Sequence, residues 1–331
     1  MEIPLLVEHR VTPADLLRPG VVAAARGRSV PESMAWSRRR TLHALTTMRP
    51  DVVVCSTARA FHPDLLGGPW TLVIDYVDRL SDSYRDRSDI VGSSPTALLF
   101  RTLARTARRF ERRPLPEGVA GIASGWDDAE SLGLDWVPNT AELPPLAEHR
   151  SPTHDVLFLG KLSYLPNVEA IERLGRAWPA ILERRPGTTL LLAGAAPERA
   201  VLDLARRRGW TVMADFADLA TVMAAARVAT APLLHASGIQ SKVLEAASFG
   251  LPQVIGRVVA NGFGPGLPAV VVDDDEQLVE ALVSILENPV ERDRLGSAAR
   301  DHVAAQYSVA RWVPWATEVL TAAAMRRRGT T

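Results

Sequence analysis

Short apolar segments alternate with amphipathic helical patterns throughout the C-terminal half of the chain, and this alternation limits the folds open to it. The apolar segments have strand length, and between most of them apolar residues recur every three or four positions. Strand and helix in alternation predict a parallel sheet covered by helices on both faces. The predicted strands are 156–159, 189–193, 210–213, 228–231, 253–255 and 269–272. The predicted helices are 169–184, 197–208, 219–226, 241–249, 277–286, 291–306 and 309–324.

The N-terminal half shows the same alternation less regularly, which indicates a smaller α/β domain. Its predicted strands are 4–7, 51–55, 71–74, 119–122 and 136–137, and its predicted helices are 36–48 and 96–110. The halves are joined by VPNTAELPPLAEHRSPTHD, which contains four prolines and few large apolar residues, as extended interdomain linkers do. We therefore expect domains at 1–150 and 151–308, followed by a C-terminal segment at 309–331.

Composition excludes several classes of protein. Lys and Arg together number 38, as do Asp and Glu, so the chain has no net charge with which to attract nucleic acid. Cys55 is the single cysteine, which excludes an intramolecular disulfide and suits a reducing cytoplasm. The start MEIPLLVEHR does not resemble a signal peptide, and no apolar run reaches the roughly 20 residues of a spanning helix. We expect a cytoplasmic protein.

Residues 228–255 have the order strand, glycine-containing loop, helix, glycine and strand, which suits an anionic ligand. A helix start presents unpaired N–H groups and the positive end of the helix dipole. Lys242 adds a positive charge there, and Glu245 can accept hydrogen bonds from hydroxyl groups. Phosphate beside a polyhydroxylated group describes a nucleotide sugar. The residues alone leave open a second interpretation, an ordinary βαβ unit with an amphipathic helix.

Two motifs resemble those of the retaining glycosyltransferases of family 4, which have the GT-B fold. GIQSKVLEAASFGLPQV is similar to the donor-site signature Gly-Ile-x-x-Lys-x-Leu-Glu-Ala, in the variant found in sugar transferases of exopolysaccharide-type systems. FLGKLSYLPN is similar to the family's Phe-x-Gly-x-Leu-x-Tyr-x-Pro-Asn motif. The resemblance implies two Rossmann-like domains facing across a cleft, with the C-terminal helix crossing back to the N-terminal domain.

The resemblance also implies a donor site. Lys242 and Lys161 are the expected catalytic residues, because Lys161 stands where many relatives carry an arginine that faces the diphosphate. In many relatives a first glutamate contacts the donor sugar, and its place is taken here by Ser237, so the sugar contacts must differ. Asp215 and Phe216 fall close to the base site of relatives. The expected donor-binding residues are Gly160, Gly194, Ser237, Gly238, Ile239, Gln240 and Glu245.

The acceptor side is less clearly marked. The stretch DYVDRLS resembles the Asp-(Tyr/Phe)-Val-Asp-x-x-Ser segment of sugar transferases in exopolysaccharide systems, with a solvated loop as the alternative interpretation. The candidates on this side are Asp75, Asp78, Ser81 and Arg59. Residues 96–110 form a basic amphipathic pattern with Leu99, Leu103, Ala107 and Phe110 opposite the arginines. This face is either simply solvated, or a peripheral contact with anionic lipid at the inner face of a membrane or with a phosphorylated acceptor.

The resemblance implies metal-independent, retaining transfer of a sugar, without a cofactor, from a nucleotide diphosphate sugar to a hydroxyl acceptor. The expected donor is a UDP-sugar, and a glycan, a glycolipid or a small metabolite would serve as acceptor. The triplet at 273–275 looks like the metal motif of another glycosyltransferase fold, but it precedes a helix, where aspartate caps N–H groups. Two alternatives remain: a GT-B module that binds a sugar nucleotide or a partner without transfer, and a sugar-nucleotide epimerase.

Overall fold

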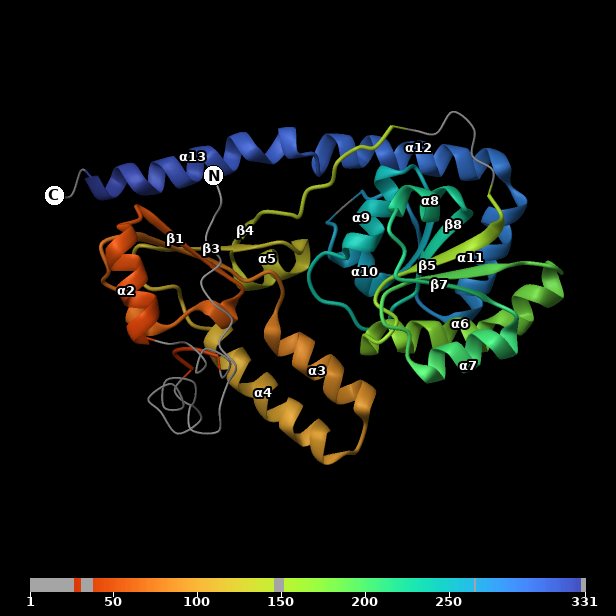
Figure 1. The fold of residues 1–331 in the computed structure, drawn as a ribbon, viewed down its shortest axis with the longest axis horizontal. Helices are drawn as coiled ribbons and strands as arrows, with labels where there is room; N and C mark the ends of the chain where they lie inside the picture. Colours follow the sequence, from red (N-terminus) through yellow and green to blue (C-terminus); the bar gives the residue numbers. More distant parts are fainter. Residues whose placement is uncertain (1–26, 31–37, 146–151, 265, 329–331) are drawn as a thin grey trace. The chain divides into compact units, whose positions relative to one another are not determined.

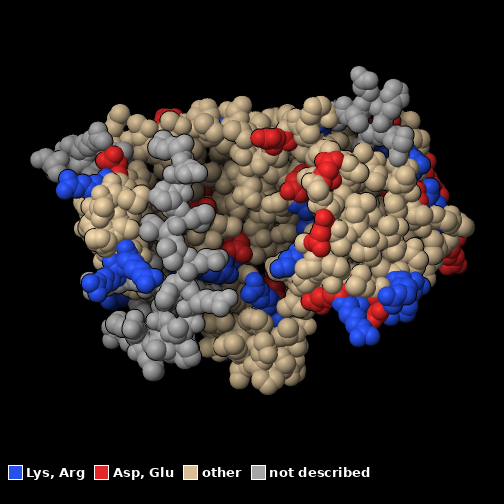
Figure 2. Space-filling model, viewed as in Figure 1, with Lys and Arg blue, Asp and Glu red and all other residues tan. Residues whose placement is uncertain are grey.

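A computed structural model describes residues 27–30, 38–145, 152–264 and 266–328. The chain divides into two compact units, one formed by Met1–Val137 with Val313–Thr331 and the other by Pro138–Trp312 (Figure 1). The predicted boundary near residue 150 therefore falls within the second unit. The predicted strand at 4–7 lies outside the described residues. On the face seen in Figure 2, acidic and basic side chains are interspersed, in keeping with a net charge of zero.

The first unit contains a four-stranded parallel sheet whose strands pair in chain order. The strands are β1 (Val52–Ser56), β2 (Thr71–Asp75), β3 (Val119–Ala123) and β4 (Asp135–Trp136). The helices are α2 (Arg38–Met48), α3 (Leu80–Val91), α4 (Pro95–Glu111) and α5 (Trp126–Leu132), with 3-10 turns η3 (Ala58–Ala60) and η4 (Pro63–Leu65). From Val313 onward, α13 (Val309–Arg328) belongs to this unit.

Helices α3 and α4 lie side by side as an antiparallel pair (Figure 1). Tyr84 of α3 stacks on Phe100 of α4, with ring centroids 6.4 Å apart. The sequence did not predict α3, because its buried face consists largely of serines, which hide the apolar period that marks a helix. The basic pattern at 96–110 was correctly predicted as a helix, but Leu99 lies on its exposed side, 56% accessible, and not in the buried stripe.

The second unit is a doubly wound α/β unit with a six-stranded parallel sheet in the order β10-β9-β8-β5-β6-β7. All six predicted strands are present: β5 (His154–Leu159), β6 (Leu190–Gly194), β7 (Thr211–Ala214), β8 (Ala226–Ala231), β9 (Gln253–Gly256) and β10 (Val270–Val272). The helices are α6 (Leu165–Arg184), α7 (Arg199–Arg208), α8 (Leu219–Ala224), α9 (Ser241–Ser248), α10 (Arg257–Asn261), α11 (Asp275–Glu287) and α12 (Pro289–Gln306). In Figure 1, α6 and α7 cover one face of this sheet, and α8 and α9 cover the other.

The strand order reverses between β5 and β8. The chain runs from β5 outward through β6 to β7, then returns to place β8 on the other side of β5 and continues through β9 to β10. In open parallel sheets, ligands bind outside the carboxyl ends of the strands at such a reversal. The loops that follow β5 and β8 are therefore the expected ligand-binding loops.

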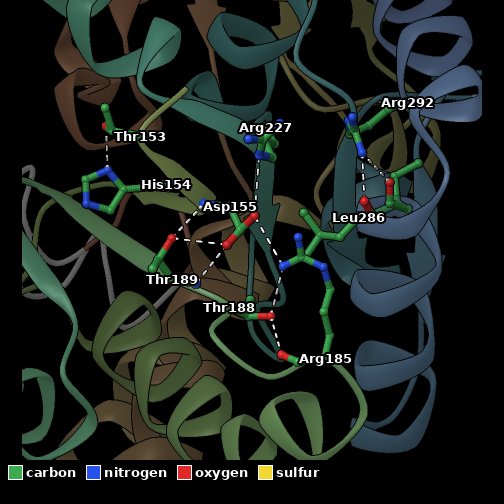
Figure 3. Close-up of polar contacts among 10 residues, drawn as sticks. Thr153, His154, Asp155, Arg185, Thr188, Thr189, Arg227, Leu286 and Arg292 are labelled. Atoms are coloured by element: carbon green, nitrogen blue, oxygen red, sulfur yellow. Dashed lines mark hydrogen bonds and ion pairs between the residues drawn. The ribbon is translucent and has the colours of Figure 1, made fainter. Parts of the chain in front are cut away.

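The opposite, amino-terminal edge of this sheet is held together by Asp155 of β5 (Figure 3). Its carboxylate accepts hydrogen bonds from the backbone N–H of Thr189, at 3.0 Å, and from the hydroxyl of the same residue, at 3.2 Å. It also pairs with Arg185 after α6, at 3.2 Å, and with Arg227 of β8, at 3.4 Å. One buried carboxylate thus ties three neighbouring strands to the end of a helix.

We expect Asp155→Ala to lower the free energy of unfolding by about 1–3 kcal/mol, because the N–H group of Thr189 and two arginines lose their common partner. The arginines are partly exposed, which limits the effect. Urea unfolding would measure it. Asp203→Ala removes an exposed pair with Arg206 and should cost at most about 0.5 kcal/mol. Equal effects of the two substitutions would contradict the role of Asp155.

Candidate functional site

Two glycines end neighbouring strands at the predicted ligand-binding edge. Gly160 follows β5 with φ 151°, and Gly194 ends β6 with φ 152°. A Cβ atom on Gly194 would lie 1.8 Å from the carbonyl oxygen of Gly160. A Cβ on Gly160 would lie 2.7 Å from Nδ2 of Asn167 and 3.2 Å from Nζ of Lys242. Only glycine therefore lets these backbones approach and leaves room for the lysine.

Lys242 lies in the first turn of α9, and its ammonium reaches over the end of β5. Nζ donates a hydrogen bond to Oδ1 of Asn167 and lies 5.1 Å from the ring centroid of Phe158. The amide group of Asn167, near the start of α6, also donates to the carbonyl oxygen of Lys161 at 2.9 Å. One buried asparagine thus fixes both the lysine and the turn that follows β5. The sequence motif contained Asn167, but its role as the link between two loops was missed.

Burial lowers the pKa of the Lys242 ammonium to about 7. Desolvation is the one cause of this shift, and among the described residues no carboxylate is paired with the ammonium. No side chain of the described residues caps the start of α9, so its first N–H groups also face the loop. An anion that bound here would restore the charge on the lysine and accept hydrogen bonds from the helix start.

Glu245 lies three residues after Lys242 in α9 and lines the same cavity. Burial raises the pKa of its carboxyl above the usual range. The half-buried carboxylate can accept hydrogen bonds from a pair of hydroxyl groups, as on a ribose. A cation and a hydroxyl-binding group therefore stand one helical turn apart.

A cavity of about 840 Å³ lies at the carboxyl ends of these strands. Most of the predicted donor-binding residues line it, together with Asp215 and Phe216, whereas Ser237 and Gly238 lie in the preceding loop and do not. A second cavity, of about 700 Å³, shares Glu245 with the first and extends to Asn139. The predicted residues that line the first cavity are Gly160, Lys161, Gly194, Ile239, Gln240, Lys242 and Glu245.

Strained backbone marks the carboxyl ends of strands in both units. Among the described residues, five residues other than glycine have positive φ. Four of these lie one or two positions after the end of a strand. Each such conformation costs about 1–3 kcal/mol and persists mainly where the surrounding structure enforces it, often at binding sites. No sequence pattern would have revealed this feature. The four residues are Thr57 (φ 73°), Val77 (φ 59°), Ala196 (φ 50°) and Asp215 (φ 48°).

The acceptor-side candidates lie in the first unit, where strands β1 and β2 end. Asp75 is the last residue of β2, and its carboxylate accepts a hydrogen bond from the backbone N–H of Val77 at 2.9 Å. Burial, and to a smaller extent the charge of Asp78, raise the pKa of Asp75. Ser81 is buried, with its backbone N–H donating to Glu111 at 3.0 Å, and Arg59 lies in η3 after β1.

Arg79, which the sequence reasoning missed, holds the Asp75–Ser81 segment in place. Its guanidinium contacts carboxylates of Asp82 at 2.9 Å, of Asp127 at 2.9 Å and of Asp128 at 2.8 Å. These acids lie at the starts of α3 and α5, so one arginine joins the two helix starts. The acidic residues on both sides of Arg79 in the sequence were the available signal for this role. Its partner on α5, Asp127, is however 48 residues away.

The Asp273–Asp275 triplet lies at the start of α11. Asp274 is the N-cap and accepts a hydrogen bond from the backbone N–H of Gln277 at 2.8 Å, which confirms the capping interpretation. Asp273 forms a bidentate ion pair with Arg257, whose Nε and Nη2 donate to its two carboxylate oxygens at 3.1 and 3.0 Å. Asp275 pairs with Arg173 at 2.6 Å. Within the described residues, no group of three or more His, Cys, Asp or Glu side chains is placed to hold a metal ion.

Comparison with known proteins agrees with this geometry. Residues 153–288 match the family model described as "Glycosyl transferases group 1". Over 151 residues, the chain is 26% identical to a GDP-mannose-dependent monoacylated alpha-(1-6)-phosphatidylinositol monomannoside mannosyltransferase of Corynebacterium glutamicum. The match covers 41% of this chain and 40% of that relative, so it spans less than half of either protein.

Solved structures with the same architecture include TarM, with a TM-score of 0.62 at 10% identity, covering 84% of this chain and 57% of TarM. They also include Anabaena HepE in complex with UDP and glucose, with a TM-score of 0.60 at 15% identity, covering 86% of this chain and 81% of HepE. The fold is GT-B. The predicted fold class is therefore confirmed, and the second unit is a doubly wound, Rossmann-like unit.

Proposed function

We propose that this GT-B protein transfers a sugar from a nucleotide diphosphate sugar to a hydroxyl group, with retention of configuration and without a metal ion. One observation carries the proposal: Lys242, a buried cation without a carboxylate partner among the described residues, stands at the strand-order reversal beside an uncapped helix start. The matched family region, 153–288, contains every residue of this arrangement. The Gly-Ile-x-x-Lys variant of its signature further favours the exopolysaccharide-type branch.

In the proposed reaction, the bond between the anomeric carbon and the diphosphate oxygen breaks, and a bond from the acceptor oxygen to that carbon forms on the same face. The acceptor's proton passes to the departing diphosphate. The protein stabilises the negative charge that develops on the diphosphate, through Lys242, Lys161 and the start of α9. Such a mechanism needs no protein nucleophile.

We propose uridine as the donor base. TarM and HepE have both been crystallised with UDP, whereas the mannosyltransferase relative depends on GDP-mannose. A thermal-shift panel of UDP, GDP, ADP, CDP and their sugars tests the proposal, because a ligand that binds only the folded state raises the melting temperature. We expect UDP and one of its sugars to give the largest shift. A larger shift with GDP would reassign the base, and no shift with any compound would contradict the donor site.

Glu245→Ala should weaken binding of the preferred nucleoside diphosphate by about 10-fold, because ribose hydroxyls lose a charged acceptor. The ribose assignment is tested with the 2′-deoxy analogue by isothermal titration calorimetry. Wild-type protein should prefer the ribonucleotide, and the variant should not distinguish the two. A preference that survives the substitution would place the ribose elsewhere.

Peripheral contact with an anionic membrane is the second part of the proposal, and the α3–α4 hairpin of the first unit carries it. Leu98 and Leu99, near its tip, are 62% and 56% exposed. In Figure 2 the tip, at the lower centre, is uncharged, with basic side chains above it. Apolar side chains beside arginines match the headgroup region of a membrane. The exposed arginines of the same helix are Arg101, Arg105, Arg108 and Arg109. No described helix is long and apolar enough to span a membrane.

A membrane contact would bring the protein to an acceptor that is a lipid. The mannosyltransferase relative is named for such an acceptor, a phosphatidylinositol monomannoside. We expect co-sedimentation with vesicles that contain phosphatidylglycerol, and not with pure phosphatidylcholine vesicles. Leu98→Ser with Leu99→Ser, or Arg101→Gln with Arg105→Gln, should reduce the bound fraction at least about fivefold. If both variants bound the vesicles as wild type does, the membrane contact would be contradicted, and the exposed face of α4 would be interpreted as simply solvated.

Product analysis separates the proposed transfer from its two alternatives. A transferase releases nucleoside diphosphate and a glycosylated acceptor, an epimerase returns an isomerised nucleotide sugar, and a binding module returns the donor unchanged.

A further inference from the structure

Helix α6 holds the loop between β8 and α9, residues 232–240, at two points one helical turn apart. Arg173 is buried, 1% exposed, and its Nη1 donates to the carbonyl oxygen of Pro232 at 3.1 Å. Glu169, four residues earlier and therefore on the same face of α6, contacts Nδ1 of His235 through Oε2 at 2.7 Å. Because Nδ1 faces the carboxylate, the Glu169 contact fixes the orientation of the imidazole ring.

The same loop is also held from its other side. A Cβ atom on Gly256 would lie 2.3 Å from the carbonyl oxygen of Leu233, and one on Gly262 would lie 2.5 Å from that of Gly238. The side-chain amide of Gln240 donates to the carbonyl oxygen of Ser237 at 3.2 Å. Glycines of the β9–α10 region thus let the backbone of the loop pack directly against them. The loop is shaped before any ligand arrives.

Three of the groups proposed to contact a nucleoside diphosphate are held by contacts that do not involve His235. Lys242 is held by Asn167, Glu245 lies within α9, and the glycine turn after β5 is held through Lys161. The loop, by contrast, ends in Ile239 and Gln240, which line the cavity beside these groups. The loop therefore stands beside the groups proposed for the diphosphate, where the sugar of the donor would follow.

We infer that Glu169 and His235 are a positioning pair that orients the 232–240 loop for the sugar of the donor, an inference that rests on the proposed function. At position 237 this chain has a serine, whose hydroxyl-bearing side chain offers the sugar no carboxylate. Backbone groups of the loop must then contact the sugar, and a backbone contact is effective only when its orientation is fixed in advance. The pair with α6 supplies that fixed orientation.

The test compares the affinities of two ligands in matched variants. UDP with UDP-glucose, and GDP with GDP-mannose, are titrated by calorimetry into wild-type protein, His235→Ala and Glu169→Ala. We expect each variant to bind the nucleoside diphosphate within twofold of wild type and to bind its sugar about 10-fold more weakly. The double variant should resemble each single one, because the two side chains act as one unit. His235→Asn, which keeps a donor near the position of Nδ1, should recover most of the loss.

Glu280→Ala is the control, because it breaks another ion pair of α6, with Arg184 at 2.6 Å, away from this loop. It should leave both affinities unchanged, and the melting temperatures of all variants verify folding. Equal losses for nucleoside diphosphate and sugar nucleotide, no loss for either, or no recovery with His235→Asn would each overturn the inference. A wild-type protein that binds none of the four ligands would overturn the proposed function as well.

Discussion

Replacing Lys242 by alanine is expected to lower the turnover number for sugar transfer by about 10²–10³-fold, the usual cost of losing one preorganised group that stabilises developing charge. The residue is suited to this role because it is held by Asn167 over the end of β5 and carries no competing ion pair among the described residues. Initial rates of nucleoside diphosphate release, at saturating donor and acceptor, would measure the change.

Two further substitutions separate charge from packing. Lys242→Met keeps most of the side-chain volume but no charge, and it should be as slow as the alanine variant. Lys242→Arg keeps the charge and should recover part of the activity, although its planar group fits the space beside Gly160 less well. If the methionine variant turned over donor at a rate close to wild type, Lys242 would not be the group that stabilises the diphosphate.

The lowered pKa of Lys242 also predicts that protons are taken up when a nucleoside diphosphate binds. Burial lowers this pKa from 10.5 to about 7, so the unfolded chain binds more protons than the folded one between these values. Stability attributable to Lys242 therefore rises with pH through that window. A bound diphosphate reverses the shift, since it favours the ammonium. At pH 8, binding of the nucleoside diphosphate should take up between about 0.5 and 1 proton, and this uptake should disappear in Lys242→Met.

Calorimetry in buffers of different ionisation enthalpy would measure the uptake. Below pH 6 the lysine is already protonated in the free protein, so uptake by this group should vanish there. Proton uptake that is the same in wild type and Lys242→Met would show that another group titrates on binding.

Gly194→Ala should cost about 3 kcal/mol or more of unfolding free energy and remove measurable donor binding. Its Cβ would stand 1.8 Å from the carbonyl oxygen of Gly160, which is backbone and cannot rotate away. Either β5 and β6 must separate at their carboxyl ends, or the turn that carries Lys161 must move. Both changes displace the surroundings of Lys242. Denaturant unfolding and nucleoside diphosphate titration would measure the two effects.

Gly187→Ala is the matched control for this substitution. Gly187 also has positive φ, 79°, but a Cβ atom there would meet nothing within 4 Å. It should therefore cost only the conformational strain, about 1 kcal/mol, and leave binding unchanged. If the two alanine variants were equally stable, close approach of the strand ends would not be the reason for glycine at 194.

Local sequence patterns were sufficient for most of the second unit. Its strands are short and buried on both faces, so each appears as a continuous apolar run, and the helices between them have clear apolar stripes. The signature at 238–254 is likewise contiguous, because one loop and one helix carry it. In the first unit, α3 and α5 were missed because serines and acids occupy faces that tertiary contacts bury or neutralise.

The amino-acid sequence by itself determined the alternation of strands and helices, the glycines at the strand ends and the presence of Lys242 and Glu245 in one helical turn. These are local properties, set by periodicity and backbone conformation over a few residues. Only the tertiary structure decided that Asn167 would hold Lys242, that Asp155 would join three strands, and that Glu169 would reach His235, 66 residues away. Such contacts depend on strand order, which no single segment encodes, because it results from packing all the strands into one sheet.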